Sequence, residues 1–221
     1  FGLFYLFKTL PIFAPIFAFA GLGFLIYKYV DRKNDDKAAN KASAQKFQEL
    51  SKKNVLQFAP WLKENVRGHD RTVQMMLQRL QQNLYLANEN RTLGAYFLVG
   101  PTGTGKTFLS ELIAQAMFPE SKPLILRMNR YRHSSDVLTL LGPPPGHQGA
   151  DIGGTLTRPV LENPYRVIIL DEIDKCHKDV LDCLYNILDV AQCTEKSSGK
   201  VVSFSRCLFF ATSNLAVEQL R

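Results

Sequence analysis

The sequence has few cysteines and histidines, and their spacing is not that of metal ligands. The 221 residues include four of each type. Cys176, Cys183, Cys193 and Cys207 lack the paired spacing of zinc sites. Cys176 and His177 are adjacent, but neighbours on a helix point about 100° apart and do not easily share a metal. The sequence therefore predicts core or surface thiols in a reduced, cytosolic setting.

Excess charge is missing from most of the chain. The formal net charge is +7, but residues 1–53 hold nine Lys or Arg against four Asp or Glu, while residues 54–221 hold eighteen against sixteen. The high sequence pI of about 9.2 is thus a property of the first part of the chain. A nucleic-acid-binding domain carries a basic surface of its own, so no nucleic-acid partner is expected.

One long uncharged run stands between Lys8 and Lys28. It has nineteen residues, rich in Phe, Ile, Leu and Ala, which as a helix reach about 28 Å, close to the thickness of a bilayer's hydrocarbon core. Pro11 and Pro15 fall in its first half, where a kink is tolerated. A signal peptide has a shorter apolar core, and a buried core helix is the remaining alternative. We expect one transmembrane helix within residues 1–30.

Cations follow the expected span far more than they precede it. Only Lys8 lies before it, whereas six follow within about twenty residues: Lys28, Arg32, Lys33, Lys37, Lys41 and Lys46. By the positive-inside rule the rest of the chain stays in the cytoplasm. Residues 31–53 are a basic juxtamembrane tether, and the membrane is an expected partner.

A phosphate-binding motif follows the apolar segment Ala95 to Val99. The pattern GxxxxGK[ST] is matched at every fixed position by Gly100, Pro101, Thr102, Gly103, Thr104, Gly105, Lys106 and Thr107. Glycines let backbone N–H groups turn toward phosphate oxygens, and a following helix adds its dipole. Lys106 is expected to reach the β- and γ-phosphates and Thr107 to bind Mg²⁺. The alternative is a glycine-rich turn without a ligand.

A second motif indicates hydrolysis. The apolar run Val167 to Leu170 is typical of a strand buried on both faces, and Asp171 and Glu172 follow it. Ligands of open α/β sheets bind at that end of the strands. Asp171 is expected to hold Mg²⁺, and Glu172 to orient or deprotonate the attacking water. Two acids at an ordinary helix N-terminus are the alternative.

A third apolar strand is expected at Cys207 to Ala211, with Thr212, Ser213 and Asn214 after it. Asn214 could point between the other two motifs and bind the attacking water or the γ-phosphate. Lys106, Glu172 and Asn214 are thus the candidate catalytic residues. Alone this signal is weak, because Asn is common in turns.

Residues 54–221 suffice for one α/β domain in three layers, a parallel sheet with helices on both faces. Apolar residues recur at helical spacing in two segments, which we expect to pack on the core. These residues are Val73, Met76, Leu77, Leu80 and Leu84 in the first, and Val180, Leu184, Ile187, Leu188 and Ala191 in the second.

Together the three motifs resemble the AAA+ ATPase module, and the segments Leu141 to Gly149 and Gly153 to Thr157 resemble the second ATPase domain of Clp-type unfoldases and disaggregases. The resemblance covers about residues 54 to 221. It implies a P-loop AAA+ large subdomain that uses ATP and Mg²⁺, with Val66 on the adenine side. It also implies self-association into a ring, hexameric in this family, and a protein substrate.

The sequence departs from that family at the candidate pore loop, Gly146, His147, Gln148 and Gly149. Threading members carry an aromatic residue there that grips the substrate polypeptide, whereas this chain has His147. His147 could still contact a polypeptide by stacking or hydrogen bonding. A solvated loop tip without a gripping role is the alternative.

Two features of the family have no matching residues in this sequence. Family members continue past Asn214 with an arginine finger and a small helical lid, which are absent before Arg221. We expect truncation, because the sequence also begins with Phe1. Arg206 and Arg221 are the nearest substitutes for the finger, and neither matches the family pattern.

The sequence therefore leads to a membrane-anchored AAA+ ATPase that remodels or unfolds proteins. One alternative is a nucleotide-gated scaffold or assembly subunit of a membrane complex, which does not thread a chain. Another is a torsin-like, activator-dependent ATPase, although Lys106 followed by Thr107 departs from the torsin pattern of Lys followed by Asn.

Overall fold

A computed structural model describes residues 59–60, 62, 66, 70–85 and 90–214. The helices are α3 (Asp70–Tyr85), α4 (Lys106–Met117), α5 (Asp136–Leu141), α6 (Thr157–Glu162) and α7 (Lys178–Val190), with short 3-10 turns η2 (Met128–Arg130) and η3 (Ile173–Lys175). The strands are β1 (Gly94–Val99), β2 (Leu124–Arg127), β3 (Arg166–Asp171), β4 (Gln192–Thr194), β5 (Val201–Ser203) and β6 (Cys207–Ser213).

Four strands form one parallel sheet in the order β1-β6-β3-β2. The central strands are the two apolar runs of the sequence, and Val167 to Leu170 and Cys207 to Phe210 are buried along their length. Burial on both faces is what a parallel sheet between two helical layers requires. The sheet places the carboxyl ends of β1, β3 and β6 at one edge, so the three motifs meet there.

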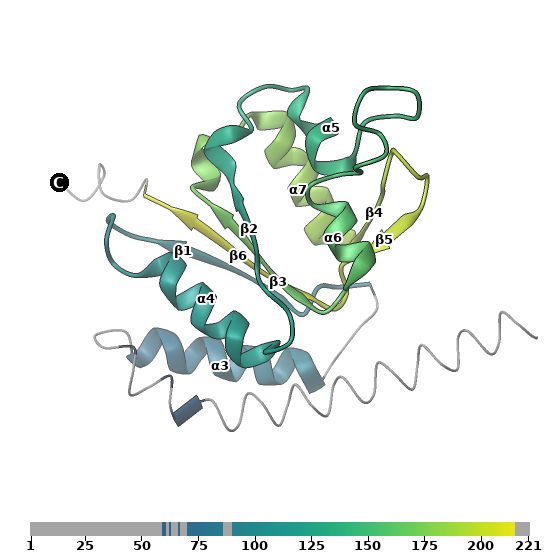
Figure 1. Cartoon of the computed structure of the whole chain (residues 1–221). Helices are drawn as coiled ribbons and strands as arrows, with labels where there is room; N and C mark the ends of the chain where they lie inside the picture. The colour runs from purple at the N-terminus through teal and green to yellow at the C-terminus, as the bar shows by residue number, and fades with distance from the viewer. Residues whose placement is uncertain (1–58, 61, 63–65, 67–69, 86–89, 215–221) are drawn as a thin grey trace, which may run out of the picture. The chain divides into compact units, whose positions relative to one another are not determined.

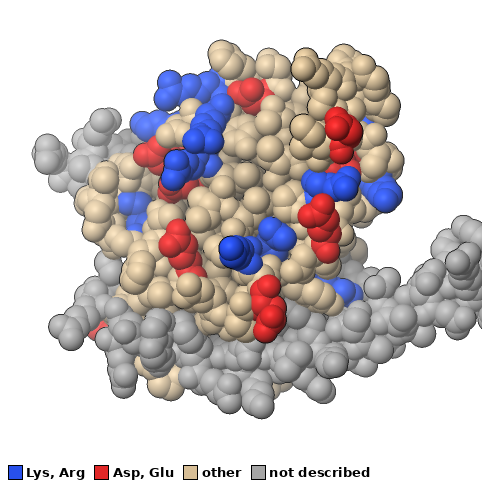
Figure 2. All heavy atoms as spheres, viewed as in Figure 1, with Lys and Arg blue, Asp and Glu red and all other residues tan. Residues whose placement is uncertain are grey.

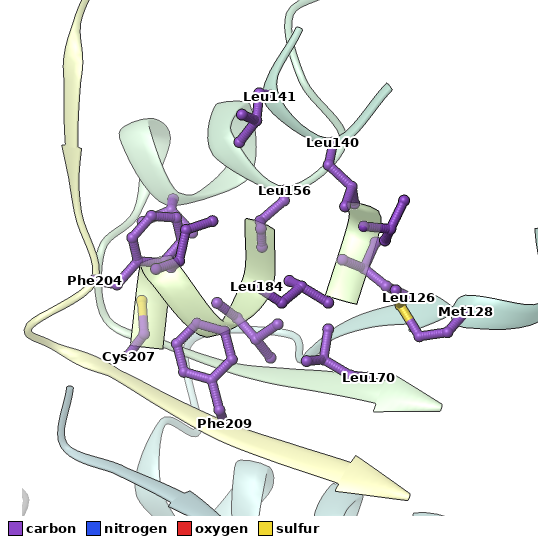
Figure 3. Packing of buried hydrophobic residues seen from close by; sticks show 14 of the residues in the cluster. Leu126, Met128, Leu140, Leu141, Leu156, Leu170, Leu184, Phe204, Cys207 and Phe209 are labelled. Atoms are coloured by element: carbon purple, nitrogen blue, oxygen red, sulfur yellow. The ribbon is translucent and has the colours of Figure 1, made fainter. Parts of the chain in front are cut away.

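Helices cover both faces of the sheet, with α3 and α4 on one side and α5, α6 and α7 on the other (Figure 1). Figure 3 shows the second layer packing on the sheet: Leu184 of α7 and Leu156 lie over Leu170 and Phe209. Phe204 contacts Phe209, with ring centroids 5.9 Å apart. The predicted three-layer α/β domain with a parallel sheet is therefore confirmed within the described residues.

The two predicted helical stripes are core faces. In α3 all five stripe residues are buried, and the helix is tied to β1 because the Asn83 side chain donates to Leu93 O (2.9 Å) and the Tyr96 hydroxyl to Met76 O (3.3 Å). In the second stripe Val180, Leu184, Ile187 and Ala191 are buried, and Leu188 packs against them. Both stripes therefore hold their segments on the sheet.

The predicted membrane span and the tether of residues 31–53 lie outside the described residues. Within the part of the chain that the structure describes, no helix combines the length and the apolarity needed to cross a bilayer.

Candidate functional site

The phosphate-loop motif lies between β1 and α4, as the sequence predicts. Gly103 and Gly105 have φ of 84° and 79°, in the left-handed region that glycine adopts without strain. A Cβ built on either would meet no atom within 4 Å. Residues 101–105 are exposed. The loop therefore presents its backbone to open space at the start of α4, where a helix favours an anion.

Lys106 joins the first motif to the third. Its Nζ donates to Gly100 O (2.7 Å), to Pro101 O (2.8 Å) and to Asn214 Oδ1 (2.9 Å). Asn214 follows β6, more than a hundred residues along the chain, yet the β1–β6 pairing carries it to the phosphate loop. The structure thus brings together two of the three predicted catalytic residues.

The two predicted metal ligands are also neighbours. The Thr107 hydroxyl donates to Asp171 Oδ1 (3.0 Å), and the Thr212 hydroxyl donates to the same oxygen (2.8 Å). Thr212 Oγ1 in turn accepts from the Glu172 backbone N–H (3.0 Å). Hydroxyl and carboxylate oxygens are the hard ligands that Mg²⁺ takes in proteins. Thr212 orients Asp171, a role that the sequence analysis did not assign.

Glu172 is held in an uncommon backbone conformation. Its φ of 56° and ψ of 51° lie in the left-handed region, which costs a residue with a side chain about 1–2 kcal/mol. Its Oε2 accepts a hydrogen bond from Asn129 Nδ2 (3.0 Å). Asn129 lies in η2, directly after β2. Asn129 holds the side chain of Glu172, and Thr212 holds its backbone N–H. Strained backbone conformations that neighbouring residues hold in place are frequent at functional sites. Asn129 was not identified from the sequence, although a polar residue following a short apolar run was the available signal.

The buried carboxylate of Asp174, in η3 directly after Glu172, supports this edge of the sheet. The Asp174 side chain is only 3% exposed, and its carboxylate approaches Lys175 Nζ at 3.4 Å. Burial by itself raises the pKa of Asp174, but hydrogen bonds from Ser213, its own backbone and Lys175 outweigh it and hold the pKa below the usual 3.8. Asp174 therefore stays ionised and ties η3 to β6 beside Asn214.

The candidate pore loop is an exposed segment between α5 and α6 (Figure 1). His147 is exposed, and local turns shape the loop because His147 N–H donates to Pro144 O (3.2 Å) and Ala150 N–H to His147 O (3.2 Å). Ile152, further along, is 73% exposed. The loop is thus accessible, and a gripping role for Gly146 to Gly149 stays a prediction.

The C-terminal end of this loop is fixed by a buried glutamate that sequence reasoning missed. Glu195, between β4 and β5, is fully buried, and its Oε1 accepts from Gly154 N–H (3.3 Å) and the Thr157 hydroxyl (3.1 Å). Its Oε2 accepts from the Ser198 hydroxyl (2.6 Å). Burial raises the pKa of Glu195, but these hydrogen bonds and Arg158 outweigh it and lower the pKa below 4.5.

Other residues named from the sequence lie apart from this site or without a tested role. Arg206 directly precedes β6, at the opposite end of the strand from Asn214. Its guanidinium lies 5.0 Å from the centre of the Tyr165 ring and donates to the Tyr165 hydroxyl. Val66 is half-buried, and its adenine-side role stays a prediction. Arg221 lies outside the described residues.

Burial raises the pKa of the Cys193 and Cys207 thiols to about 12. No cluster of metal-ligating side chains occurs among the described residues.

The parallel sheet, the phosphate loop and the carboxylates at the sheet edge define a phosphate-loop nucleoside triphosphatase domain. The family model described as AAA domain (Cdc48 subfamily) matches residues 91–221. The chain belongs to this family, and it is an AAA+ ATPase of the Clp type.

Curated relatives are similar over most of this chain. "Chaperone protein ClpB" of Staphylococcus epidermidis is 36% identical over 177 residues, which are 79% of this chain and 20% of the relative. The protein of the same name from Staphylococcus aureus gives the same values. That from Lactococcus lactis subsp. cremoris is 34% identical over 177 residues. The chain therefore spans about a fifth of the length of these relatives.

Proposed function

We propose that this chain hydrolyses ATP with Mg²⁺ and uses the reaction to remodel or unfold protein substrates within a ring of identical copies, six by family resemblance. The proposal is based on two hydrogen bonds at one edge of the sheet, from Lys106 to Asn214 and from Thr107 to Asp171. The name of the similar proteins, chaperone, supports a protein as the substrate.

The residues present fit a magnesium nucleotide. Gly103 and Gly105 leave open space in front of the loop backbone, and Lys106 supplies the one cation of the motif. Thr107 and Asp171 would hold Mg²⁺, which when bound neutralises charge on the phosphoryl group being transferred. The Thr107 hydroxyl and the Asp171 carboxylate lie 3.0 Å apart.

Glu172 and Asn214 are proposed to act on the attacking water. Glu172 follows Asp171 at the end of β3, and its carboxylate can accept the proton that the water loses. Asn129 donates to Oε2, so this hydrogen bond fixes the orientation of the carboxylate. Asn214 Oδ1 accepts from Lys106 Nζ, which leaves its amide N–H groups free to donate toward a phosphate or water oxygen.

Among the described residues, no arginine bonds to Lys106, Thr107, Asp171 or Asn214. Arg206 lies at the far end of β6 and does not act as an arginine finger in its own chain. In a ring the neighbouring copy or a further segment would supply such an arginine, which is typically worth about 10³ to 10⁵ in rate. Turnover should therefore depend on assembly.

We also propose that residues 1–30 anchor the protein to a membrane with the ATPase domain on the cytoplasmic side. The support is the nineteen-residue uncharged run and the excess of Lys and Arg after it. Remodelling would then act on proteins at or near that membrane.

The test is Mg²⁺-dependent ATP turnover of the full chain in mild detergent across protein concentrations. We expect turnover to rise steeply with concentration, and Glu172→Gln to bind ATP but lose at least about 10² in turnover. Lys106→Ala serves as the variant that loses nucleotide binding. Tight binding with no turnover in the parent at any concentration would reject the motor.

A nucleotide-gated scaffold is the second candidate, and His147 favours it because this exposed position carries an imidazole in place of Phe, Tyr or Trp. For a scaffold, Glu172→Gln and the parent should assemble alike on ATP and neither should turn it over. A fluorescent unfolded protein offered to the assembled ring separates the two functions, because a scaffold leaves it unchanged.

A further inference from the structure

Strand β2 is an edge of the sheet that the described strands form. It pairs with β3 alone, through Leu124 to Arg127, and no other described strand pairs with it. Such an edge presents backbone N–H and C=O groups that can pair with another extended chain. Figure 1 shows β2 at the margin of the sheet, before η2 begins.

A groove of about 540 Å³ runs along this edge. All four β2 residues line it, and its remaining walls are Arg130, Tyr131 and Thr155. Ile125 is 41% exposed there, although it is a large aliphatic side chain. The Tyr131 hydroxyl lies 3.1 Å from Thr155 Oγ1, and Thr155 Oγ1 also lies 3.0 Å from Thr139 O, so one wall is held in place.

The groove is positively charged. Arg127 and Arg130 are exposed, and neither makes an ion pair within 4.0 Å with a carboxylate of the described residues. The run from Leu124 to His133 contains three arginines and no acidic residue. Figure 2 shows Lys and Arg side chains at the upper left of this face, with Asp and Glu side chains beside them, in the region into which β2 runs in Figure 1. Asp171, beside Arg127 in the ladder, is already bonded by two hydroxyls.

We propose that this groove binds an extended acidic polypeptide segment, which adds to the sheet as a strand beside β2. The backbone edge supplies the ladder of hydrogen bonds, Ile125 supplies apolar contact, and Arg127 and Arg130 pair with carboxylates on the segment. A nucleic acid or free polyanion would use the two arginines but leave the strand edge and Ile125 without a role. The segment therefore belongs to a protein partner.

The groove lies next to the exposed loop between α5 and α6, so a partner bound in the groove would lie beside that loop. Thr155 directly follows Gly153 and Gly154, where the candidate pore loop returns to the domain. A strand bound at β2 would thus lie beside the base of that loop. The binding itself requires no ATP hydrolysis, so its test is independent of the proposed motor.

The test measures fluorescence anisotropy of a labelled, end-blocked peptide of about six residues, a usual strand length, in which Val and Asp alternate. We expect the full chain in mild detergent to bind it and to ignore the matching Val-Lys peptide. A second version carries N-methyl groups on alternate backbone nitrogens, keeps its charge and should bind at least about tenfold more weakly, because it cannot complete a ladder.

The charge reversal Arg127→Glu with Arg130→Glu should weaken binding at least about tenfold. The matched control is Lys178→Glu with Lys200→Glu, which makes the same change in net charge at two exposed lysines outside the groove and should leave affinity unchanged. Nucleotide binding reports that each variant is folded. If the reversal does not fold, Arg127→Gln with Arg130→Gln takes its place, with a smaller loss expected.

Three results would overturn the proposal. Equal binding of the N-methylated and parent peptides would mean a general polyanion patch. Equal binding by the reversal variant would place the peptide elsewhere. A reversal that alters sedimentation of the chain but leaves peptide affinity unchanged would make the groove a contact between copies of this chain.

Discussion

Replacing Glu195 by alanine should destabilise the domain and release the loop between α5 and α6. Its carboxylate accepts three hydrogen bonds, from Gly154 N–H, the Thr157 hydroxyl and the Ser198 hydroxyl. Gly154 and Thr157 are buried, so water does not replace the lost acceptor, whereas Ser198 is exposed and can turn to solvent. The variant therefore leaves two buried donors without partners.

Each such donor costs about 1–3 kcal/mol, so the expected loss is about 2–6 kcal/mol. That is a large part of the 5–15 kcal/mol typical of a domain. At about 2–4 °C per kcal/mol the thermal midpoint should fall by roughly 4 to 24 °C. Glu195→Gln keeps one acceptor oxygen in place and should cost about 1 kcal/mol.

The assay is thermal unfolding of the full chain in mild detergent, followed by circular dichroism. Limited proteolysis within residues 142–153 reports whether the loop has been released. The control is Glu162→Ala, which breaks only the exposed pair with Arg158 and should change stability by less than about 0.5 kcal/mol. A midpoint for Glu195→Ala within 2 °C of the parent, in about the range of that control, would refute the reasoning.

The pH dependence of stability gives a second reading of Glu195. The pKa of Glu195 is lower in the folded state than its usual 4.5. Its contribution is therefore present above about pH 4.5 and is lost as the pH falls through the lower folded value. Asp174 titrates in the same direction, so Glu195→Gln should reduce the loss of stability in acid without abolishing it.

Three further substitutions test the site and its support. Thr212→Val removes one of the two hydroxyls on Asp171 Oδ1, and titration of turnover should show about a tenfold higher Mg²⁺ requirement; an unchanged requirement would exclude this orienting role. Lys106→Ala should weaken binding of a fluorescent ATP analogue at least about tenfold with little change in melting temperature, and retained affinity would contradict the phosphate-site assignment. Gly154→Ala would put a Cβ 2.2 Å from Leu140 O, so the midpoint of urea unfolding should fall by the equivalent of about 1–3 kcal/mol or more.

Much of the candidate nucleotide site could be predicted because its signals are local. The glycines, Lys106 and Thr107 occupy fixed spacings that a turn before a helix imposes on any chain. Asp171 and Asn214 follow apolar runs that only buried strands explain. Since parallel strands end at one edge of a sheet, their convergence also followed from the sequence.

The supporting residues could not be predicted, because their roles depend on contacts between distant segments. Asn129 meets Glu172 across forty-three residues, and Glu195 meets Gly154 across forty-one. An isolated Glu after a strand reads as a solvated residue, and nothing near Glu195 in the sequence names its partners. Only the folded hairpin and loop bring those donors to it.

The sequence by itself determined the class of chemistry, because phosphate binding needs particular residue types at short fixed spacings. It also determined the sheet, because two uninterrupted apolar runs must be buried on both faces. The tertiary structure decided which residues orient the proposed catalytic groups, how the loop of His147 is held, and that β2 is a basic edge of the sheet among the described strands. Those properties arise from pairing and packing over long sequence separations, which no local pattern encodes.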